Sequence, residues 1–139
     1  MARINSMGLN EMLQDIAAEQ KATPEIMRHM IEAAGDVYVE ETRNQIKEMN
    51  IFDTGATWWS IKRGKSTKAG DGVRLEVWPA GTRVDKNHPD GERVETIAFV
   101  TEYGTKRRKA RPFMSNAAKI AAPKAEQAML DVWERESKL

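Results

Sequence analysis

One long amphipathic helix constrains the fold of this chain more than any other feature of the sequence. Thr23-Pro24 can begin it, because Thr caps a first turn and Pro fits the first helical position. Apolar residues then recur at helical spacing to about residue 49: Met27, Met30, Ile31, Ala34, Val37, Tyr38, Ile46 and Met49. We interpret the methionines as core filling. Gly35 interrupts the helix, which we interpret as a close packing contact.

Two more helices are predicted, one before the long helix and one at the C-terminal end of the chain. Apolar spacing predicts a short amphipathic helix over residues 9–21, at the periphery of the fold. From Pro112 the chain reads as helical to near its C-terminus, with Pro123 either kinking or restarting the helix. The apolar side of this last helix is formed by Phe113, Ala117, Ala121, Ala125, Ala128, Met129, Val132 and Trp133.

The middle region carries turn and strand signals. Asp53-Thr54-Gly55 has turn chemistry, and we predict that a strand-like segment opens at Trp58-Trp59-Ser60-Ile61 and ends in Arg63-Gly64-Lys65. Apolar residues that alternate with polar ones predict a half-buried strand that ends at Pro79: Val73, Leu75 and Val77. Residues 80–93 read as an exposed loop that is long for a hairpin connection.

Residues 94–103 fit either a strand or a helix. We favour a strand that enters a short helix, with Gly104 just past its end as a left-handed cap. The predicted fold is therefore α+β, with a small antiparallel sheet packed against the long N-terminal helix and the C-terminal helix. At 139 residues we expect a single domain over residues 1–139, in which residues 1–22 are peripheral.

Composition narrows the possible functions. The chain has no cysteine, which excludes disulfides and thiolate chemistry, and no apolar run near the roughly 20 residues that span a bilayer. We expect an intracellular product without a membrane segment. The net charge is +1, but residues 1–55 hold 5 basic against 10 acidic side chains, and residues 56–139 hold 17 against 11. This asymmetry is compatible with self-association of an acidic face with a basic loop.

Residues that could do chemistry are few and scattered. His29 has Ala33 at i+4, so it forms no helical metal pair, and His88 lies in a turn beside Asp90. The serines have no nucleophile-elbow context, and no phosphate-binding glycine loop or dinucleotide fingerprint is present. We therefore expect no enzymatic activity, no catalytic residue, no metal site and no cofactor.

A basic run between residues 106 and 111 is the strongest candidate for a contact site. Its cations are Lys106, Arg107, Arg108, Lys109 and Arg111. Such a run can neutralise phosphates of a nucleic acid, or it can be a loop presented to another protein. We expect the nearby aromatic residues Phe99, Tyr103 and Phe113 to be core anchors at the two ends of the loop, which weakens the nucleic-acid interpretation.

Three segments in fixed order carry a resemblance to a known family. An N-terminal helical region that opens with Gly8-Leu9 is followed by Asp53-Thr54-Gly55 and Ser60-Ile61. AFVTEYGT (residues 98–105) and ARPFM (residues 110–114) then lead into the last helix. Together they resemble the small tail-component proteins of tailed bacteriophages, a family of neck and tail-completion proteins. The triplet Thr57 to Trp59 departs from the family pattern.

The resemblance implies a non-catalytic structural protein of a phage or prophage virion. Its copies would form a ring, six as the expected number, that joins the tail tube to the head connector and lets DNA pass. Its partners would be connector or stopper proteins and tail terminator or tube proteins, and assembly would occur in the host cytoplasm. The alternative is a small nucleic-acid-binding accessory protein that uses the 106–111 loop.

The motif around this loop also follows folding logic. Gly104 permits a positive φ where an element ends. Glu102 can accept hydrogen bonds from the backbone or Thr105, or pair with a basic residue, while Pro112 presets the entry into the helix and Phe113 enters the core. The motif residues expected to be structural are Asp53, Thr54, Gly55, Ser60, Ile61, Glu102, Tyr103, Gly104, Thr105, Pro112 and Phe113.

Overall fold

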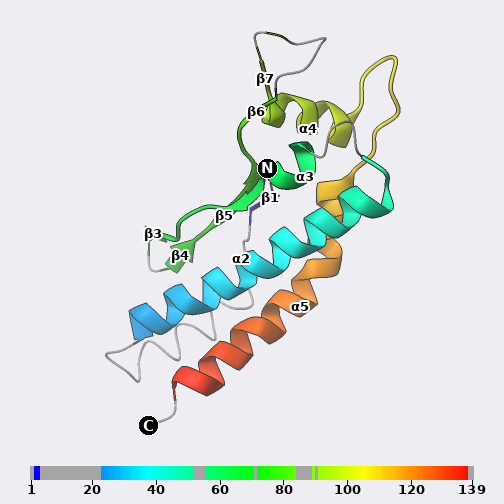
Figure 1. The fold of residues 1–139 in the computed structure, drawn as a ribbon. Helices are drawn as coiled ribbons and strands as arrows, with labels where there is room; N and C mark the ends of the chain where they lie inside the picture. The colour runs from blue at the N-terminus through cyan, green and yellow to red at the C-terminus, as the bar shows by residue number, and fades with distance from the viewer. Residues whose placement is uncertain are drawn as a thin grey trace.

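Two long antiparallel helices form the centre of the fold. The computed structural model describes residues 2–3, 23–51, 56–70, 72–83, 89 and 91–137. Helix α2 (Thr23–Glu48) packs along α5 (Phe113–Glu136), and small antiparallel sheets contact α2 (Figure 1). The predicted α+β architecture, with a long N-terminal and a C-terminal helix against small antiparallel sheets, is confirmed. No helix in the described ranges is long and apolar enough to cross a bilayer.

Helix α2 has the extent that its apolar spacing predicts, and its core side also contains polar residues. Met30, Ala34 and Ile46 are completely buried. Between them Glu41 and Thr42 are buried too, which explains why the apolar stripe pauses in the sequence. The Nζ of Lys124 on α5 donates to Glu41 over 2.6 Å, and this hydrogen bond raises the pKa of Lys124.

Gly35 marks a close approach between α2 and the strands, as predicted. A Cβ atom at this position would lie 2.7 Å from both the Cδ of Arg63 and the Cδ2 of Leu75. Arg63 crosses α2 here and pairs through its Nε with Asp36 at 2.9 Å. Glycine therefore lets the strands approach α2 at the cost of some helix propensity.

The strands are short and all pair antiparallel. In the largest sheet β5 (Glu76–Pro79) lies between β1 (Ala2–Arg3) and β2 (Ile61–Arg63). Strands β3 (Thr67–Ala69) and β4 (Gly72–Arg74) form a hairpin, and β6 (Thr82–Arg83) pairs with β7 (Glu92–Arg93). The predicted alternation is observed at Leu75 and Val77, which are buried, and the strand ends at Pro79. The prediction of a single strand is wrong, because the segment is divided at Leu75 into β4 and β5, which belong to different sheets, and Val73 is only half-buried.

The prediction of a strand from Trp58 is wrong for its first residues. Residues Ala56–Ser60 form a short helix, α3, and the strand begins at Ile61. A strand and a helix both send adjacent side chains in different directions, so the neighbouring tryptophans do not distinguish the two. Trp58 is half-buried against α2, whereas Trp59 is 68% exposed.

The prediction of a strand within residues 94–103 is also wrong, because helix α4 (Val94–Tyr103) occupies the whole segment and the strand β7 precedes it. The buried side of α4 consists of Val94, Ala98 and Glu102, at i, i+4 and i+8. A carboxylate fills the third position of this stripe. The apolar pattern alone was therefore too short to reveal the helix.

Helix α5 continues through Pro123 without a restart. Its buried side includes Ala117, Ala121 and Ala125, whose small side chains allow α2 to approach closely. Pro123 lies on the exposed side. A proline inside a helix removes one backbone hydrogen bond, so α5 loses that bond at this position without ending.

Four predicted features lie wholly or partly outside the described residues. They are the 9–21 helix, the turn Asp53-Thr54-Gly55, residues 84–88 and 90 of the 80–93 loop, and His88. The described ends of that loop pair as strands β6 and β7, which corrects the prediction of a loop over the whole segment.

Candidate interaction site

Glu102 joins the last turn of α4 to the first turn of α5. Its carboxylate accepts hydrogen bonds from the backbone N–H of Met114 at 2.8 Å and of Ser115 at 3.1 Å, and from the Ser115 hydroxyl. The residue before α5 is Pro112, which has no side-chain acceptor to cap those N–H groups. A side chain from another helix thus performs the capping, and its negative charge lies at the favourable end of the α5 dipole. Of the predicted partners for Glu102, the backbone is the one observed.

Gly104 lets the chain leave α4 and fold back on itself. Its φ is 75° and its ψ is −179°, a region that essentially only glycine occupies, and its N–H donates to the Val100 carbonyl at 2.8 Å. A Cβ here would lie 2.7 Å from the Ala110 nitrogen and 2.8 Å from the Arg108 oxygen. The predicted position and positive φ are observed, although ψ differs from that of a left-handed helical cap.

The basic loop, residues 105–111, is folded by its own hydrogen bonds. The Thr105 hydroxyl accepts from the N–H groups of Arg107 and Arg108, and the Thr105 N–H donates to the Arg108 carbonyl at 2.9 Å. The Arg111 N–H donates to Thr101 of α4 at 2.8 Å, which closes the loop over the end of that helix. Thr105 therefore organises the loop and makes no bond to Glu102.

The cations of the basic loop point away from the fold. Residues 105–110 are exposed and Arg111 is half-buried. Across the ranges that the structure describes, none of the five cations forms an ion pair. The loop extends beyond the ends of α4 and α5 in Figure 1. It thus presents five positive charges to whatever approaches this end of the molecule.

Two of the three aromatic residues near the loop are not core anchors, which corrects the prediction. Phe113 is completely buried, but Phe99 is 64% and Tyr103 is 63% exposed. Their rings lie one helical turn apart on α4, with centroids 4.8 Å from each other. Because only Gly104 separates Tyr103 from the loop, an aromatic pair lies close in the chain to the five cations. We refer to Phe99, Tyr103 and residues 105–111 as the α4–loop surface.

Comparisons with known proteins do not add to this description. No protein-family model matches the chain, and no curated protein or solved structure matches it. Function must therefore be argued from the geometry and from the motif resemblance.

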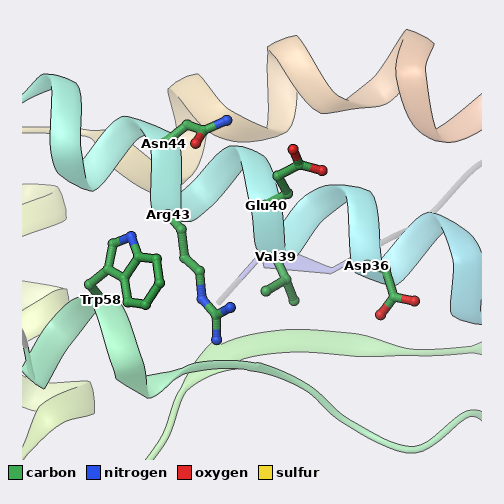
Figure 2. A pocket seen from close by; sticks show the side chains of 6 residues that line it. All are labelled: Asp36, Val39, Glu40, Arg43, Asn44 and Trp58. Carbon is green, nitrogen blue, oxygen red and sulfur yellow. The ribbon is translucent and has the colours of Figure 1, made fainter.

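Helix α3 is fixed to α2 by a cation–aromatic contact. The Arg43 guanidinium carbon lies 4.7 Å from the Trp58 ring centroid, and the Lys47 ammonium lies 5.4 Å from it. Arg43 also donates to the Ile61 carbonyl at 2.9 Å. Figure 2 shows Trp58 beside Arg43 at one end of a hollow of about 340 Å³. The remaining lining residues of this hollow are Asp36, Val39, Glu40 and Asn44.

The motif residues Ser60 and Ile61 lie at the junction of α3 and β2. Both are buried, and the Ser60 carbonyl accepts from the Ala80 N–H at 2.9 Å. Their position anchors α3, from which Trp59 projects into solvent. Trp59 is thus a second exposed aromatic element, and α3 packs against α4.

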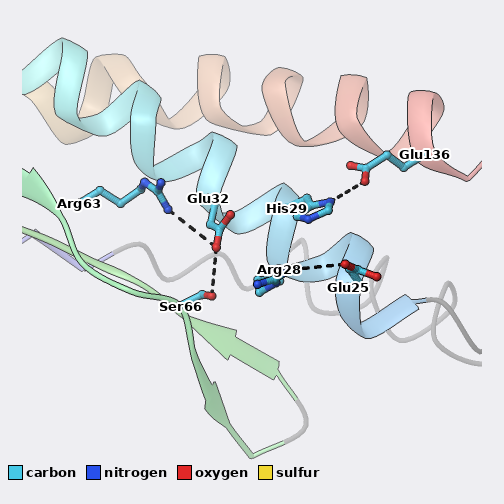
Figure 3. Close-up of polar contacts among 7 residues, drawn as sticks. All are labelled: Glu25, Arg28, His29, Glu32, Arg63, Ser66 and Glu136. Carbon is cyan, nitrogen blue, oxygen red and sulfur yellow. Dashed lines mark hydrogen bonds and ion pairs between the residues drawn. The ribbon is translucent and has the colours of Figure 1, made fainter.

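At the end of the α2–α5 helix pair that lies away from the basic loop, titratable residues connect helices and strands. His29 Nδ1 lies 2.5 Å from Glu136 Oε1 and links the start of α2 to the end of α5 (Figure 3). Glu32 accepts from the Ser66 hydroxyl at 3.5 Å and lies 3.9 Å from Arg63. Within the described ranges, no group of three or more His, Cys, Asp or Glu is arranged to hold a metal ion.

The structure brings one part of the predicted motif together and leaves another part undescribed. Glu102, Gly104, Thr105 and Phe113 form a single junction around the basic loop, whereas Asp53, Thr54 and Gly55 lie outside the described residues. Sequence reasoning did not identify Phe99 and Trp59 as surface residues. Once α4 is known to be helical, the i, i+4 spacing of Phe99 and Tyr103 shows that they share a face that is different from the buried stripe.

Proposed function

We propose that this chain is a non-catalytic structural protein of a phage or prophage virion. Copies of it form a homo-oligomeric ring, of six by analogy with the family it resembles, at the head–tail junction or the proximal end of the tail. The ring joins the tail tube to the head connector, and its partners are connector or stopper proteins and tail terminator or tube proteins. Assembly takes place in the host cytoplasm, and DNA passes through the ring.

The junction around the basic loop is the observation that carries this proposal. Glu102 ties α4 to α5, and Gly104 takes a conformation that other residues avoid. Together they hold a loop of unpaired cations away from the core. The unusual backbone conformation of Gly104 and the buried carboxylate of Glu102 fix the position of the loop, and the loop is a surface that another macromolecule can contact. The motif that carries the resemblance is thus also the frame of a contact loop.

The composition of the α4–loop surface supports a contact with protein. Phe, Tyr and Arg are enriched at the centres of protein interfaces, where aromatic rings supply apolar area and arginine supplies hydrogen bonds. Phe99 and Tyr103 keep about two thirds of their surface exposed beside the cations. A monomer gains nothing from exposing two adjacent aromatic side chains, whereas a ring-shaped oligomer would bury them in its interfaces.

The exposed aromatic side chains of Phe99 and Tyr103 also support a second candidate function. Exposed aromatic side chains next to cations can stack on unpaired bases while the cations neutralise phosphates. The exposure of Phe99 and Tyr103 removes the earlier objection that the basic loop lacks an aromatic partner. A nucleic-acid-binding accessory protein that uses residues 106–111 is therefore the alternative.

Neutralising the loop separates the two candidates. The variant carries Lys106→Gln, Arg107→Gln, Arg108→Gln and Lys109→Gln. If the chain is a ring protein, the wild type sediments as an oligomer and the variant loses mass. If it is a nucleic-acid binder, the variant keeps the mass of the wild type and loses a salt-sensitive mobility shift with single-stranded DNA. A matched control neutralises exposed cations of the strands: Lys62→Gln, Lys65→Gln and Lys68→Gln.

A wild-type protein that is monomeric at every concentration, and that binds DNA through the loop, would contradict the ring proposal. An oligomer that is unaffected by the loop variant would leave the ring proposal standing but would remove the basic loop from its interface.

A further inference from the structure

The outward face of α5 changes in character along the helix. Five of its exposed residues follow one another at intervals of three or four, which places them on one stripe away from the buried alanines: Ile120, Pro123, Gln127, Asp131 and Glu134. The first two are apolar, and Ile120 is 41% exposed although it is a large aliphatic residue. The last two carry carboxylates. We refer to this stripe as the α5 face.

The charges of the α5 face are available to a partner. Asp131 accepts a hydrogen bond from Gln127 of the same helix at 2.9 Å, and Glu134 makes no ion pair within the described part of the chain. Lys119 and Lys124 adjoin the apolar end of the stripe, but Lys124 is already paired with Glu41. The cation that adjoins the acidic end, Arg135, lies 4.0 Å from Glu136, so Asp131 and Glu134 remain without an ion pair of their own in the described ranges.

The α4–loop surface has the complementary pattern. It presents an aromatic pair, Phe99 and Tyr103, followed closely in the chain by the five cations of the loop. On the α5 face, an apolar part is followed by two carboxylates. Ile120 and Asp131 are separated by about 16 Å at the rise of an α-helix, a span that aromatic rings and long basic side chains on a loop can cover together.

We infer that the α4–loop surface of one copy binds the α5 face of a second copy. Phe99 and Tyr103 pack on Ile120 and Pro123, while the loop cations reach Asp131 and Glu134. This inference rests on the homo-oligomeric assembly proposed above and adds the two surfaces that make it.

The position of the two surfaces makes the association head-to-tail. The loop extends from one end of the helix pair, and the acidic residues lie toward the C-terminal end of α5, at the other end (Figure 1). One copy cannot bring its own loop to its own acidic residues. Each interface thus uses two different patches and leaves one of each free, so that copies add on until a ring closes.

Self-association accounts for more of the molecule than nucleic-acid binding does. Nucleic acid would use the loop and the rings but would leave the exposed Ile120 and the carboxylates of the α5 face without a role. A net charge of +1 also means that the loop cations are matched by acidic groups on the same chain.

Two broken variants and their mixture test this inference. The loop variant carries Arg107→Glu and Arg108→Glu, and the helix variant carries Asp131→Lys and Glu134→Lys. All four positions are exposed, so circular dichroism should show that both variants fold. Each variant alone should associate roughly 10- to 100-fold more weakly than the wild type, because like charges then meet across the interface.

The mixture of the two variants should assemble as alternating copies. The intact loop of the helix variant meets the intact α5 face of the loop variant, and the reversed loop of the loop variant meets the reversed face of the helix variant with the charges exchanged. A variant with all four substitutions should assemble again, since the charges are exchanged and still complementary. Sedimentation velocity at moderate and high salt measures all four samples, with Lys62→Glu and Lys68→Glu as the control for reversed charge on another surface.

The outcomes distinguish failure of this inference from failure of the proposed function. If the wild type assembles and neither variant weakens it, these two surfaces are not the interface, although the ring proposal stands. If the loop variant fails and the helix variant assembles normally, the loop binds elsewhere and the inference is overturned. If the wild type is monomeric and binds a single-stranded oligonucleotide in a salt-sensitive way, and the loop variant does not bind it, both this inference and the proposed ring are overturned. The chain is then a nucleic-acid-binding protein.

Discussion

Replacing Glu102 should destabilise the junction between α4 and α5 that holds the basic loop. In the Glu102→Ala variant the Met114 N–H, which is buried, loses its acceptor, and so do the N–H and hydroxyl of the more exposed Ser115. A buried donor left without a partner costs about 1–3 kcal/mol, and loss of a helix cap costs about 0.5–2 kcal/mol. Water can reach Ser115, which limits the second cost.

We therefore expect Glu102→Ala to lower the free energy of unfolding by about 2–4 kcal/mol. The Glu102→Gln variant keeps the shape and one acceptor oxygen but loses the charge, and should cost about 1–2 kcal/mol. Urea denaturation followed by circular dichroism measures both. The matched control is Glu95→Gln on the same helix, where the carboxylate pairs with exposed Arg93 at 2.5 Å and should contribute less than about 1 kcal/mol.

A double-mutant cycle with Ser115→Ala gives a sharper test. Because Glu102 and the Ser115 hydroxyl are hydrogen-bonded, their effects should not add, and the coupling should be about 0.5–3 kcal/mol. If Glu102→Ala unfolds at the same urea concentration as the wild type, the carboxylate does not cap α5 and does not hold the loop in position.

Three further perturbations test other parts of the structure. Gly104→Ala should destabilise the fold by about 2 kcal/mol or more in urea denaturation, since its φ is 75° and a Cβ meets the Ala110 backbone, whereas Gly70→Ala, which meets nothing, should cost about 1 kcal/mol; equal losses would contradict the close approach. Burial and the charge of Glu126 raise the pKa of Tyr38, so the stability that the folded state gains by holding this proton is present below pH 10 and is lost as the pH rises through the folded pKa. Tyr38→Phe should therefore flatten the decline of the urea midpoint above pH 10. An unchanged decline would contradict the assignment to Tyr38. Phe99→Ser should leave thermal stability within about 0.5 kcal/mol of the wild type, because the ring is exposed, while it weakens association in sedimentation; a large loss of stability would show that the ring packs in the core.

The helices of the fold could be predicted where their buried side is apolar. The stripe on α2 runs through Met30, Ala34 and Ile46, which are buried, and it gave the helix its correct extent. On α4 the same logic failed, because Glu102 takes a buried position and its role becomes clear only when the first turn of α5 lies beside it. A long-range cap of this kind leaves no periodic signal.

The surroundings of the basic loop were predicted in part. The basic loop and its frame could be located from the sequence, because glycine and proline mark chain reversals and helix starts. Phe99 and Tyr103 were assigned to the core by their apolar character, and the helical phase of α4 places them on the surface instead. The acidic end of the α5 face was also not singled out, because surface carboxylates on a helix are common and gain meaning only beside an exposed Ile120.

The mass of the wild-type protein in solution tests the central claim most directly. Sedimentation equilibrium over a dilution series should show a closed oligomer whose mass is a multiple of the 15.7 kDa chain, and its dissociation should be promoted by salt because charged surfaces meet in it. A single species of 15.7 kDa at every concentration would contradict the account that this chain assembles with copies of itself.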